Sequence, residues 1–207
     1  MTGQFKITYK YLEEIGACDE GLDAFKGEYP IEEYPEGVAY QDVLDRCAKK
    51  EPSFGMWLFA KVGSTDDVRV FDKPVNNTKG VIIFAGSLEF GYKVLIKSID
   101  AGRDIKANSS IIADEHIKTG KHIIAGNGIE AGFSIEAGGD IKAGGDIKAG
   151  GSIGAGCDIK ANGSIGAGWD IKAGRDIEAG LDIIAGRHIK AGRVVMKFKF
   201  HKDGRNC

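Results

Sequence analysis

The stretch "GGDIKAGGDIKAGGSIGAGCDIKANGSIGAGWDIKAG", residues 138–174, repeats one six-residue phrase with little variation. The phrase extends in both directions, because every sixth residue from Ile99 to Ile189 is isoleucine, sixteen in succession, and Val195 continues the series. Two positions after isoleucine stands alanine in fifteen of sixteen cases, and the next position is glycine thirteen times and otherwise Asn or Asp. Asp, Ser or His precedes every isoleucine but one. A period this regular determines the fold.

A short strand explains these columns. Side chains alternate between the two faces of a strand, so Ile-x-Ala directs both apolar groups inward. Gly, Asn and Asp tolerate a left-handed backbone, and we expect that conformation where the chain turns each corner. Glycine at every sixth position excludes a helix, and collagen has a three-residue period. The sequence therefore predicts a mainly β protein, a three-sided parallel β-helix with 18 residues per coil and a little over five coils.

The texture of the chain divides it into four parts. Residues 1–66 place apolar residues three and four positions apart, which predicts a small α-helical domain with a core around Phe25, Trp57, Leu58 and Phe59. Residues 67–97 have the pattern of strands around a turn and are expected to cap the first coil. The repeat occupies residues 98–193, and residues 194–207 are expected to form a C-terminal capping strand and a basic tail.

Composition indicates a folded chain of one or two domains, since 207 residues with 43% hydrophobic content can bury a core. The formal net charge of −2 provides no overall attraction to nucleic acid or to a membrane surface. No apolar run is long enough to cross a bilayer, and the start of the chain lacks a secretory segment, so we expect a cytoplasmic protein without a membrane partner. Four scattered cysteines without a CxxC pair are expected to stay reduced.

The hexads "DIKAGGDIKAG", residues 140–150, resemble those of hexapeptide-repeat parallel β-helix proteins. That group includes left-handed acyltransferases and right-handed, polymer-forming bactofilins, and the resemblance covers about half of the chain. Handedness stays open, because the large and small apolar positions are reversed relative to the acyltransferases. Separately, "LEEIGACDEGLDAFKGEYP", residues 12–30, is similar to opening segments of small phage and bacterial accessory proteins that carry repeated tails.

The repeat contains no pattern that predicts catalysis. The acyltransferases that it resembles need a histidine in a cleft, often built by a loop, whereas no loop interrupts Ile99 to Ile189. His116, His122 and His188 stand in the column that otherwise holds Asp or Ser, so we expect them to bond backbone groups at the corners. His116 and His188 would lie about 19 Å apart, too far to share zinc. No catalytic residue, metal ligand or cofactor is predicted.

Function is expected in the outward columns, where side chains are free to vary. With 18 residues per coil, the position after each turn residue aligns into ridges. One ridge carries Phe133, Trp169 and Arg187, and Ile112 and Ile184 project from the same face. Exposed aromatic residues beside arginine are typical of protein-binding hot spots, so we predict contact with another chain here. The alternative is that the helical domain folds back over these residues.

Two charged surfaces are also predicted. A second ridge is basic and consists of Arg103, Lys121, Arg175 and Arg193. Near the N-terminus, nine carboxylates face a single Lys26, and they are Glu13, Glu14, Asp19, Glu20, Asp23, Glu28, Glu32, Glu33 and Glu36. This acidic patch is either a solvated helix face or an imitation of a row of phosphates that occupies a nucleic-acid-binding protein.

These observations favour a non-enzymatic protein that binds another protein, either a second copy or a host complex. An inhibitor made by a phage or mobile element against a host defence or nucleic-acid-processing complex is the sharper form of this prediction. The alternatives are a self-assembling filament subunit like the bactofilins and, second, a hexapeptide acyltransferase. Direct binding of nucleic acid is not expected, because the repeat lysines alternate with Asp and Glu. We expect a homodimer or small oligomer.

Overall fold

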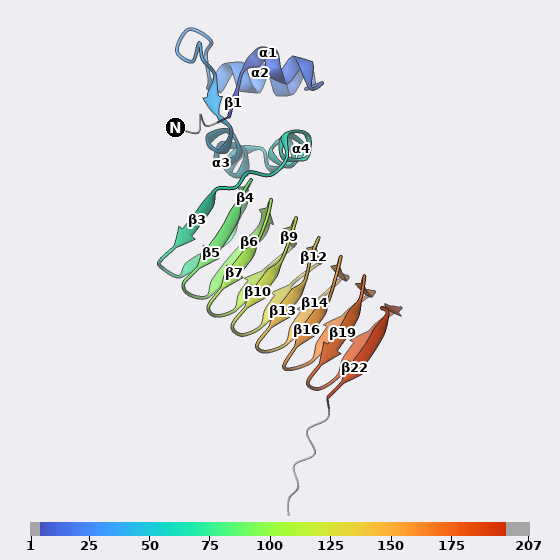
Figure 1. Ribbon diagram of the computed structural model, residues 1–207. Helices are drawn as coiled ribbons and strands as arrows, with labels where there is room; N and C mark the ends of the chain where they lie inside the picture. The colour runs from blue at the N-terminus through green and yellow to red at the C-terminus, as the bar shows by residue number, and fades with distance from the viewer. Residues whose placement is uncertain (1–4, 198–207) are drawn as a thin grey trace, which may run out of the picture.

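A computed structural model describes residues 5–197 of the chain. It contains a helical unit at one end of a long β-solenoid (Figure 1). The helical unit consists of β1 (Lys6–Ile7), α1 (Tyr9–Glu14), α2 (Asp19–Glu28), β2 (Val38–Ala39), α3 (Tyr40–Lys50) and α4 (Pro52–Val62). The solenoid begins with β3 (Val68–Phe71), β4 (Val75–Phe84), β5 (Ser87–Phe90) and β6 (Val94–Ala101).

The hexad strands follow, each with isoleucine at or near its start. They are β7 (Ile105–Ala107), β8 (Ile111–Ala113), β9 (Ile117–Thr119), β10 (Ile123–Ala125), β11 (Ile129–Ala131), β12 (Ile135–Ala137), β13 (Ile141–Ala143), β14 (Ile147–Ala149), β15 (Ile153–Ala155), β16 (Ile159–Ala161), β17 (Ile165–Ala167), β18 (Ile171–Ala173), β19 (Asp176–Ala179), β20 (Ile183–Ala185) and β21 (Ile189–Lys190). The last described strand is β22 (Arg193–Met196).

The solenoid has three faces, and each face consists of parallel strands. Through the repeat, the strands of one face follow one another at 18-residue intervals. One face is an eight-stranded sheet in the order β22-β19-β16-β13-β10-β7-β5-β3. The other two faces join into one sheet, because the first half of β6 pairs with β8 and its second half pairs with β9. The fold is therefore mainly β, a three-sided parallel solenoid of about seven coils with the helices at its N-terminal end.

The isoleucine column fills the interior as the sequence predicts. On the eight-stranded face Ile105, Ile123, Ile141 and Ile159 lie directly against one another from coil to coil, and each is 0% exposed. The alanine two positions later also points inward and is buried on most strands. Burial of an isoleucine side chain contributes roughly 2 kcal/mol. Each hexad buries its isoleucine only by packing against neighbouring coils, so a single coil is not stable alone and stability arises from the whole stack.

The corner glycines do not have the backbone conformation that the sequence predicts. Within residues 5–197, positive φ occurs only at Gly16, Gly37 and Gly63, which all precede the repeat. Close packing between coils favours glycine instead, because a Cβ on Gly144 would lie 2.0 Å from the carbonyl oxygen of Gly126, one coil earlier. The prediction of left-handed corners is therefore wrong, and the close approach of successive coils is the physical reason for glycine.

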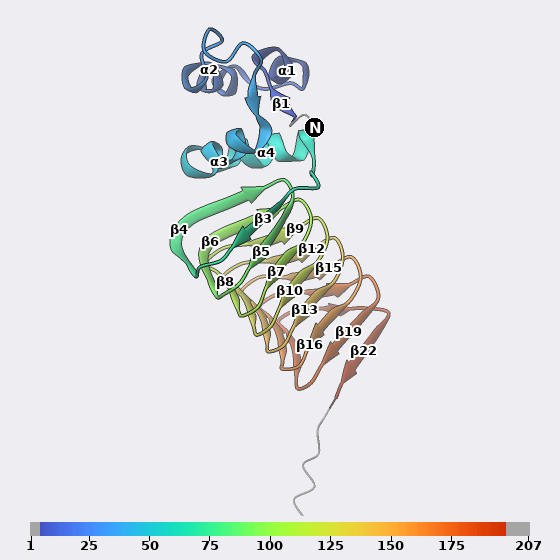
Figure 2. The same cartoon turned by 60° about the vertical axis from the view of Figure 1, so that its left-hand side comes forward.

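The coil geometry begins before the hexads. Leu88 and Val94 occupy the isoleucine column and pair with Ile105 and Ile111, so residues 67–97 already wind as part of the same sheets. Helices α3 and α4 lie over β4 at this end (Figure 2). The Gln41 amide joins the two layers, since it donates to the Ile83 carbonyl (3.0 Å) and accepts from the Ala85 N–H (3.0 Å).

The coil geometry changes after the last hexads. Val194, and not Val195, stands opposite Ile177, so the final coil is one residue shorter than the pattern requires. The prediction that Val195 continues the interior column is wrong, because the corner before β22 is one residue short. Arg193 therefore stands opposite Asp176, where the residue before isoleucine stands in earlier coils, instead of opposite Arg175 in the basic ridge. Residues 194–196 of the expected capping strand lie in β22, and the rest of that segment lies outside the described residues.

Candidate interaction surfaces

The phrase Asp-Ile-Lys places opposite charges on the outer surface on either side of a buried isoleucine. Lys142 Nζ lies 2.6 Å from Asp140 Oδ2, and Lys148 Nζ lies 2.7 Å from Asp146 Oδ2. The hydrogen bond from Lys142 holds the pKa of Asp140 below its ordinary value. The lysines of these pairs are accessible to solvent, although Asp140 itself is buried, and such pairs contribute at most about 1 kcal/mol each. Their main consequence is that many repeat lysines and aspartates neutralise one another along the surface.

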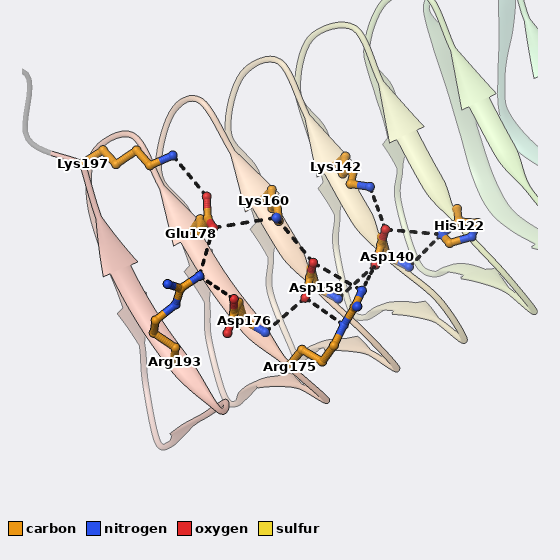
Figure 3. A network of polar contacts seen from close by, with 10 residues as sticks. All are labelled: His122, Asp140, Lys142, Asp158, Lys160, Arg175, Asp176, Glu178, Arg193 and Lys197. Carbon is orange, nitrogen blue, oxygen red and sulfur yellow. Dashed lines mark hydrogen bonds and ion pairs between the residues drawn. The ribbon is translucent and has the colours of Figure 1, made fainter.

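A ladder of hydrogen bonds links the coils at one corner (Figure 3). The side chain that precedes each isoleucine accepts a bond from the backbone N–H of the equivalent residue one coil later. The bonds run from His122 N to Asp104 Oδ1 (3.1 Å), Asp140 N to His122 Nδ1 (2.9 Å), Asp158 N to Asp140 Oδ1 (3.1 Å) and Asp176 N to Asp158 Oδ1 (3.2 Å). The predicted corner bonding is confirmed for His122 and for the aspartates of this column. For His116 and His188 the prediction is wrong, because their side chains contact the Phe133 ring and the Asp170 carboxylate instead.

The basic ridge lies beside this ladder, and three of its four cations are engaged in ion pairs. Figure 3 shows the ion pairs of Arg175 and Arg193. The pairs are Arg103 with Asp66, Arg175 with Asp140 and Asp158, and Arg193 with Asp176 and Glu178. Lys121 makes no ion pair with any residue in the range 5–197. Carboxylates of the same chain thus offset most of the positive charge, and the ridge presents no uncompensated row of cations to a phosphate backbone.

The histidines serve the coils in different ways. His122 belongs to the corner ladder, and His188 Nδ1 lies 3.1 Å from Asp170 Oδ1. The His116 ring stacks on the Phe133 ring, with 5.4 Å between centroids and 25° between planes. In the described part of the chain, no three His, Cys, Asp or Glu side chains gather in a way that could hold a metal ion.

The predicted aromatic ridge is a continuous column at another corner. Backbone N–H groups donate from Phe133 to Glu115 (2.9 Å), from Gly151 to Phe133 (2.7 Å), from Trp169 to Gly151 (3.0 Å) and from Arg187 to Trp169 (2.9 Å). Successive members are therefore one coil apart, about 4.8 Å, which separates the two aromatic residues by about 10 Å. Glycine between them keeps a side chain out of that interval.

Both aromatic side chains of the ridge face solvent. Phe133 is 55% exposed and Trp169 is 53% exposed. The Arg187 guanidinium lies over the Trp169 ring, 5.1 Å from its centroid, so the cation and the ring present one joint surface. The helical unit lies at the end of the solenoid, where its helices contact β4 (Figures 1 and 2). The alternative that it folds back over the aromatic ridge is wrong.

Ile112 and Ile184 lie on one face but do not join the ridge into a single patch. They stand at the centres of β8 and β20 in one outward column, four coils apart. Glu130, Lys148 and Gly166 separate them. Ile184 is 64% exposed, and Ile112 is half-buried. Of the two, Ile184 has the larger exposed apolar surface, and no contact within its own chain accounts for an isoleucine at that position.

The acidic patch covers α1, α2 and the loop to β2, at the far end of the helical unit from the solenoid (Figure 1). Eight of its nine carboxylates are exposed. Glu28 is the exception, because it is half-buried and pairs with Arg46 and Lys50 of α3. The hydrogen bond from Lys50 holds the Glu28 pKa below its ordinary value. Glu28 is therefore a structural link between α2 and α3, and eight residues of the patch are accessible to a partner.

Sequence reasoning missed a hollow of about 850 Å³ between α2 and the pair α3 and α4. The rings of Phe54 and Trp57 stack on one wall, 5.3 Å apart. Phe25 and Leu58 are buried as predicted, whereas Trp57 and Phe59 are only half-buried. Helical periodicity marked these residues as apolar without showing that they leave a space. Cys47 lines the hollow, and burial raises its pKa to about 11, which keeps the thiol protonated.

No family model, curated protein or solved structure matches the chain. None of the helices within residues 5–197 is long and apolar enough to cross a membrane. The surfaces themselves therefore carry the functional argument.

Proposed function

We propose that the protein is a non-enzymatic interaction protein whose solenoid presents the aromatic ridge of Phe133, Trp169 and Arg187 to a protein partner. The observation that carries the proposal is that two large aromatic side chains stand more than half exposed on a rigid column, although neither supports the core. Exposed aromatics packed with arginine are the usual centre of a binding hot spot. The backbone ladder orders the ridge before binding, which lowers the entropy cost of association.

The ridge can be tested with a matched control. Tyr92 is 54% exposed at the equivalent corner position of another ridge, just before β6. Proteins captured by the wild-type chain are compared with those captured by Phe133→Ala/Trp169→Ala and by Tyr92→Ala. A partner that the double variant loses, and that Tyr92→Ala retains, supports the proposal, and its dissociation constant should rise at least tenfold. Equal capture by all three chains contradicts it.

The sharper form of the proposal is inhibition of a host nucleic-acid-processing complex, with the acidic patch as a second contact. Eight exposed carboxylates on a small helical unit support it, because such a surface attracts the cationic groove of a nuclease or similar protein. The test is competition with DNA for such a protein at rising salt concentrations. Competition that weakens with salt, and that Asp19→Asn/Glu20→Gln/Asp23→Asn reduces, supports the contact. Competition unaffected by salt or by these substitutions refutes it.

The bactofilin-like filament is the structural alternative, and it requires two open ends that stack. The helices over β4 argue against it, because a further coil cannot pair with β4 where α3 and α4 lie. An acyltransferase is a weaker proposal still, since the three repeat histidines make corner or stacking contacts within the solenoid.

A further inference from the structure

The C-terminal end of the solenoid is uncovered among the described residues. In the interior column, Ile165, Ile171 and Ile177 are 0% exposed, whereas Ile189 is 43% exposed and Val194 is 47% exposed. The last strands β20, β21 and β22 pair with a strand on one side only, with β17, β18 and β19 respectively. The end therefore presents apolar side chains and a free backbone edge together, a combination that binds another β edge.

The two ends of the solenoid are not equivalent. At the first coil, Ile83 and Ala85 are buried beneath the helical unit, and Gln41 satisfies the Ile83 carbonyl and the Ala85 N–H. The edge of β3 is also unpaired at this end, with Val68 and Val70 exposed, but α3 and α4 lie over β4. Among the described residues, a whole further coil can therefore pair only at the C-terminal end. A chain with one self-complementary end forms a closed dimer. A two-fold contact buries the same surface on both copies, so no such end remains exposed for a third copy.

We propose that two copies of this chain join at their C-terminal coils about a two-fold axis that crosses the face of β21, midway between β21 and its copy. The coils rise about 4.8 Å per turn, so β20, β21 and β22 descend by about 1.6 Å from one to the next. An axis at the middle strand of the three gives every new strand pair the same spacing of about 4.8 Å. An axis at β20 or β22 would leave one gap too wide and another too narrow.

This arrangement pairs β22 of each copy antiparallel with β20 of the other. Inside the solenoid, Val194 and Met196 then face Ala185 and Ile183 of the second copy, respectively, so each pair sets a larger side chain beside a smaller or flexible one. Outside, Val195 faces Ile184 of the second copy, which explains why an isoleucine stands 64% exposed on an outward column. At the end of the same pairing, Lys197 faces Asp182 of the second copy, a pair of opposite charges.

Across the axis, β21 pairs with its copy. Ile189 faces Ala191 of the second copy inside the solenoid, and the two Lys190 side chains face each other outside. The two lysines repel each other weakly, because both are exposed and screened by salt. Lys190→Gln should therefore tighten the pair, whereas Ile184→Lys should loosen it by placing charge against Val195.

The proposal does not depend on which protein binds the aromatic ridge. Its test measures the mass of the particle in solution and not the capture of a partner protein. Light scattering of the full-length chain should give twice the 22.1 kDa of one chain at all concentrations above the dissociation constant. Ile184→Lys should raise the dimer dissociation constant at least tenfold. Ile112→Lys is the matched control, since Ile112 occupies the same outward column at the other end of the face and should leave the mass unchanged.

Cross-linking tests the axis itself. Antiparallel partners have Cα atoms about 4.5 to 5.5 Å apart, which suits a disulfide, so Lys190→Cys should give a covalent dimer on oxidation. Lys172→Cys, one coil earlier in the same column, should not. A monomer at high concentration, a mass that grows steadily with concentration, or equal cross-linking of the two cysteine variants would each overturn the proposal.

Discussion

One pair of substitutions tests whether glycine stands at the corners because successive coils approach too closely there for a side chain, as the structure shows. The sequence suggests instead that the backbone at these corners is left-handed, which the structure does not show. Gly156 lies at a corner, where an added Cβ would sit 2.0 Å from the Gly138 carbonyl oxygen of the preceding coil. Gly154, two residues earlier, is at the outward centre of β15, where an added Cβ would meet nothing within 4 Å. The two positions belong to the same coil, and they differ in whether an added Cβ meets the preceding coil.

The expected magnitude follows from the contacts at the corner. Relief of the overlap requires the coils to separate by about 1 Å at this point, which lengthens the Gly156 N to Ala137 O bond from 2.9 Å. Asn162 shows that a corner can yield, because its own N–H bond to Ala143 is 3.2 Å long. A weakened hydrogen bond costs about 1 kcal/mol, and overpacking adds about 1 kcal/mol or more. Gly156→Ala should therefore destabilise the stack by about 2 kcal/mol.

Gly154→Ala should have the opposite sign, since alanine in a strand is favoured over glycine by about 0.5 to 1 kcal/mol. Thermal unfolding followed by circular dichroism measures both, and a loss of 2 kcal/mol lowers the midpoint by roughly 4 to 8 °C in a chain of this size. Equal midpoints for the two variants would refute the argument from close approach. A Gly156→Asn variant much more stable than Gly156→Ala would restore the left-handed interpretation.

Three further substitutions test other parts of the structure. Asp158→Ala should cost about 1 to 2 kcal/mol by leaving the Asp176 N–H without its acceptor, whereas Asp158→Ser should retain most of the stability in denaturant titration. Burial raises the pKa of Asp100 to about 6, so the stability that its neutral form provides is present below pH 4 and is lost as pH rises through 6. Asp100→Asn should therefore be more stable than wild type by about 3 kcal/mol at pH 7 and equal to it at pH 4. The same difference in free energy of unfolding between the two proteins at both pH values would contradict this. Gln41→Ala should cost about 2 to 3 kcal/mol and increase hydrogen exchange at the Ala85 amide, because it leaves two buried backbone groups unbonded.

The regular parts of the solenoid could be predicted because one residue type recurs at one spacing. Ile-x-Ala fixes which side chains point inward, and 18 residues per coil then aligns Phe133, Gly151 and Trp169 without further information. The shorter last coil could also have been predicted from the sequence. Val194 is an apolar residue where the pattern requires Asp, Ser or His, which indicates that one residue is missing.

Other features could not be inferred from the pattern. Gly, Asn and Asp are shared by left-handed corners and by corners that approach a neighbouring carbonyl, so composition alone does not separate the two. The hollow beside Trp57 depends on how far apart α2 and α4 lie, which helical periodicity does not determine. The pairing of Arg175 with Asp140 and Asp158 depends on which corner the arginine leans across.

The contrast between two corners of the solenoid bears most directly on function. At the basic corner, Arg175 and Arg193 are tied to aspartates of their own chain, so a partner would have to break ion pairs to reach them. At the aromatic corner, the Phe133 ring stacks on His116, Arg187 lies over the Trp169 ring, and both rings remain more than half exposed, so they lose little by gaining a partner. If two copies join at their C-terminal coils, each particle also presents two such ridges on one rigid body. Two linked sites bind a repeated or dimeric target far more tightly than one, so a ridge of modest affinity would then suffice for a partner that is itself an assembly.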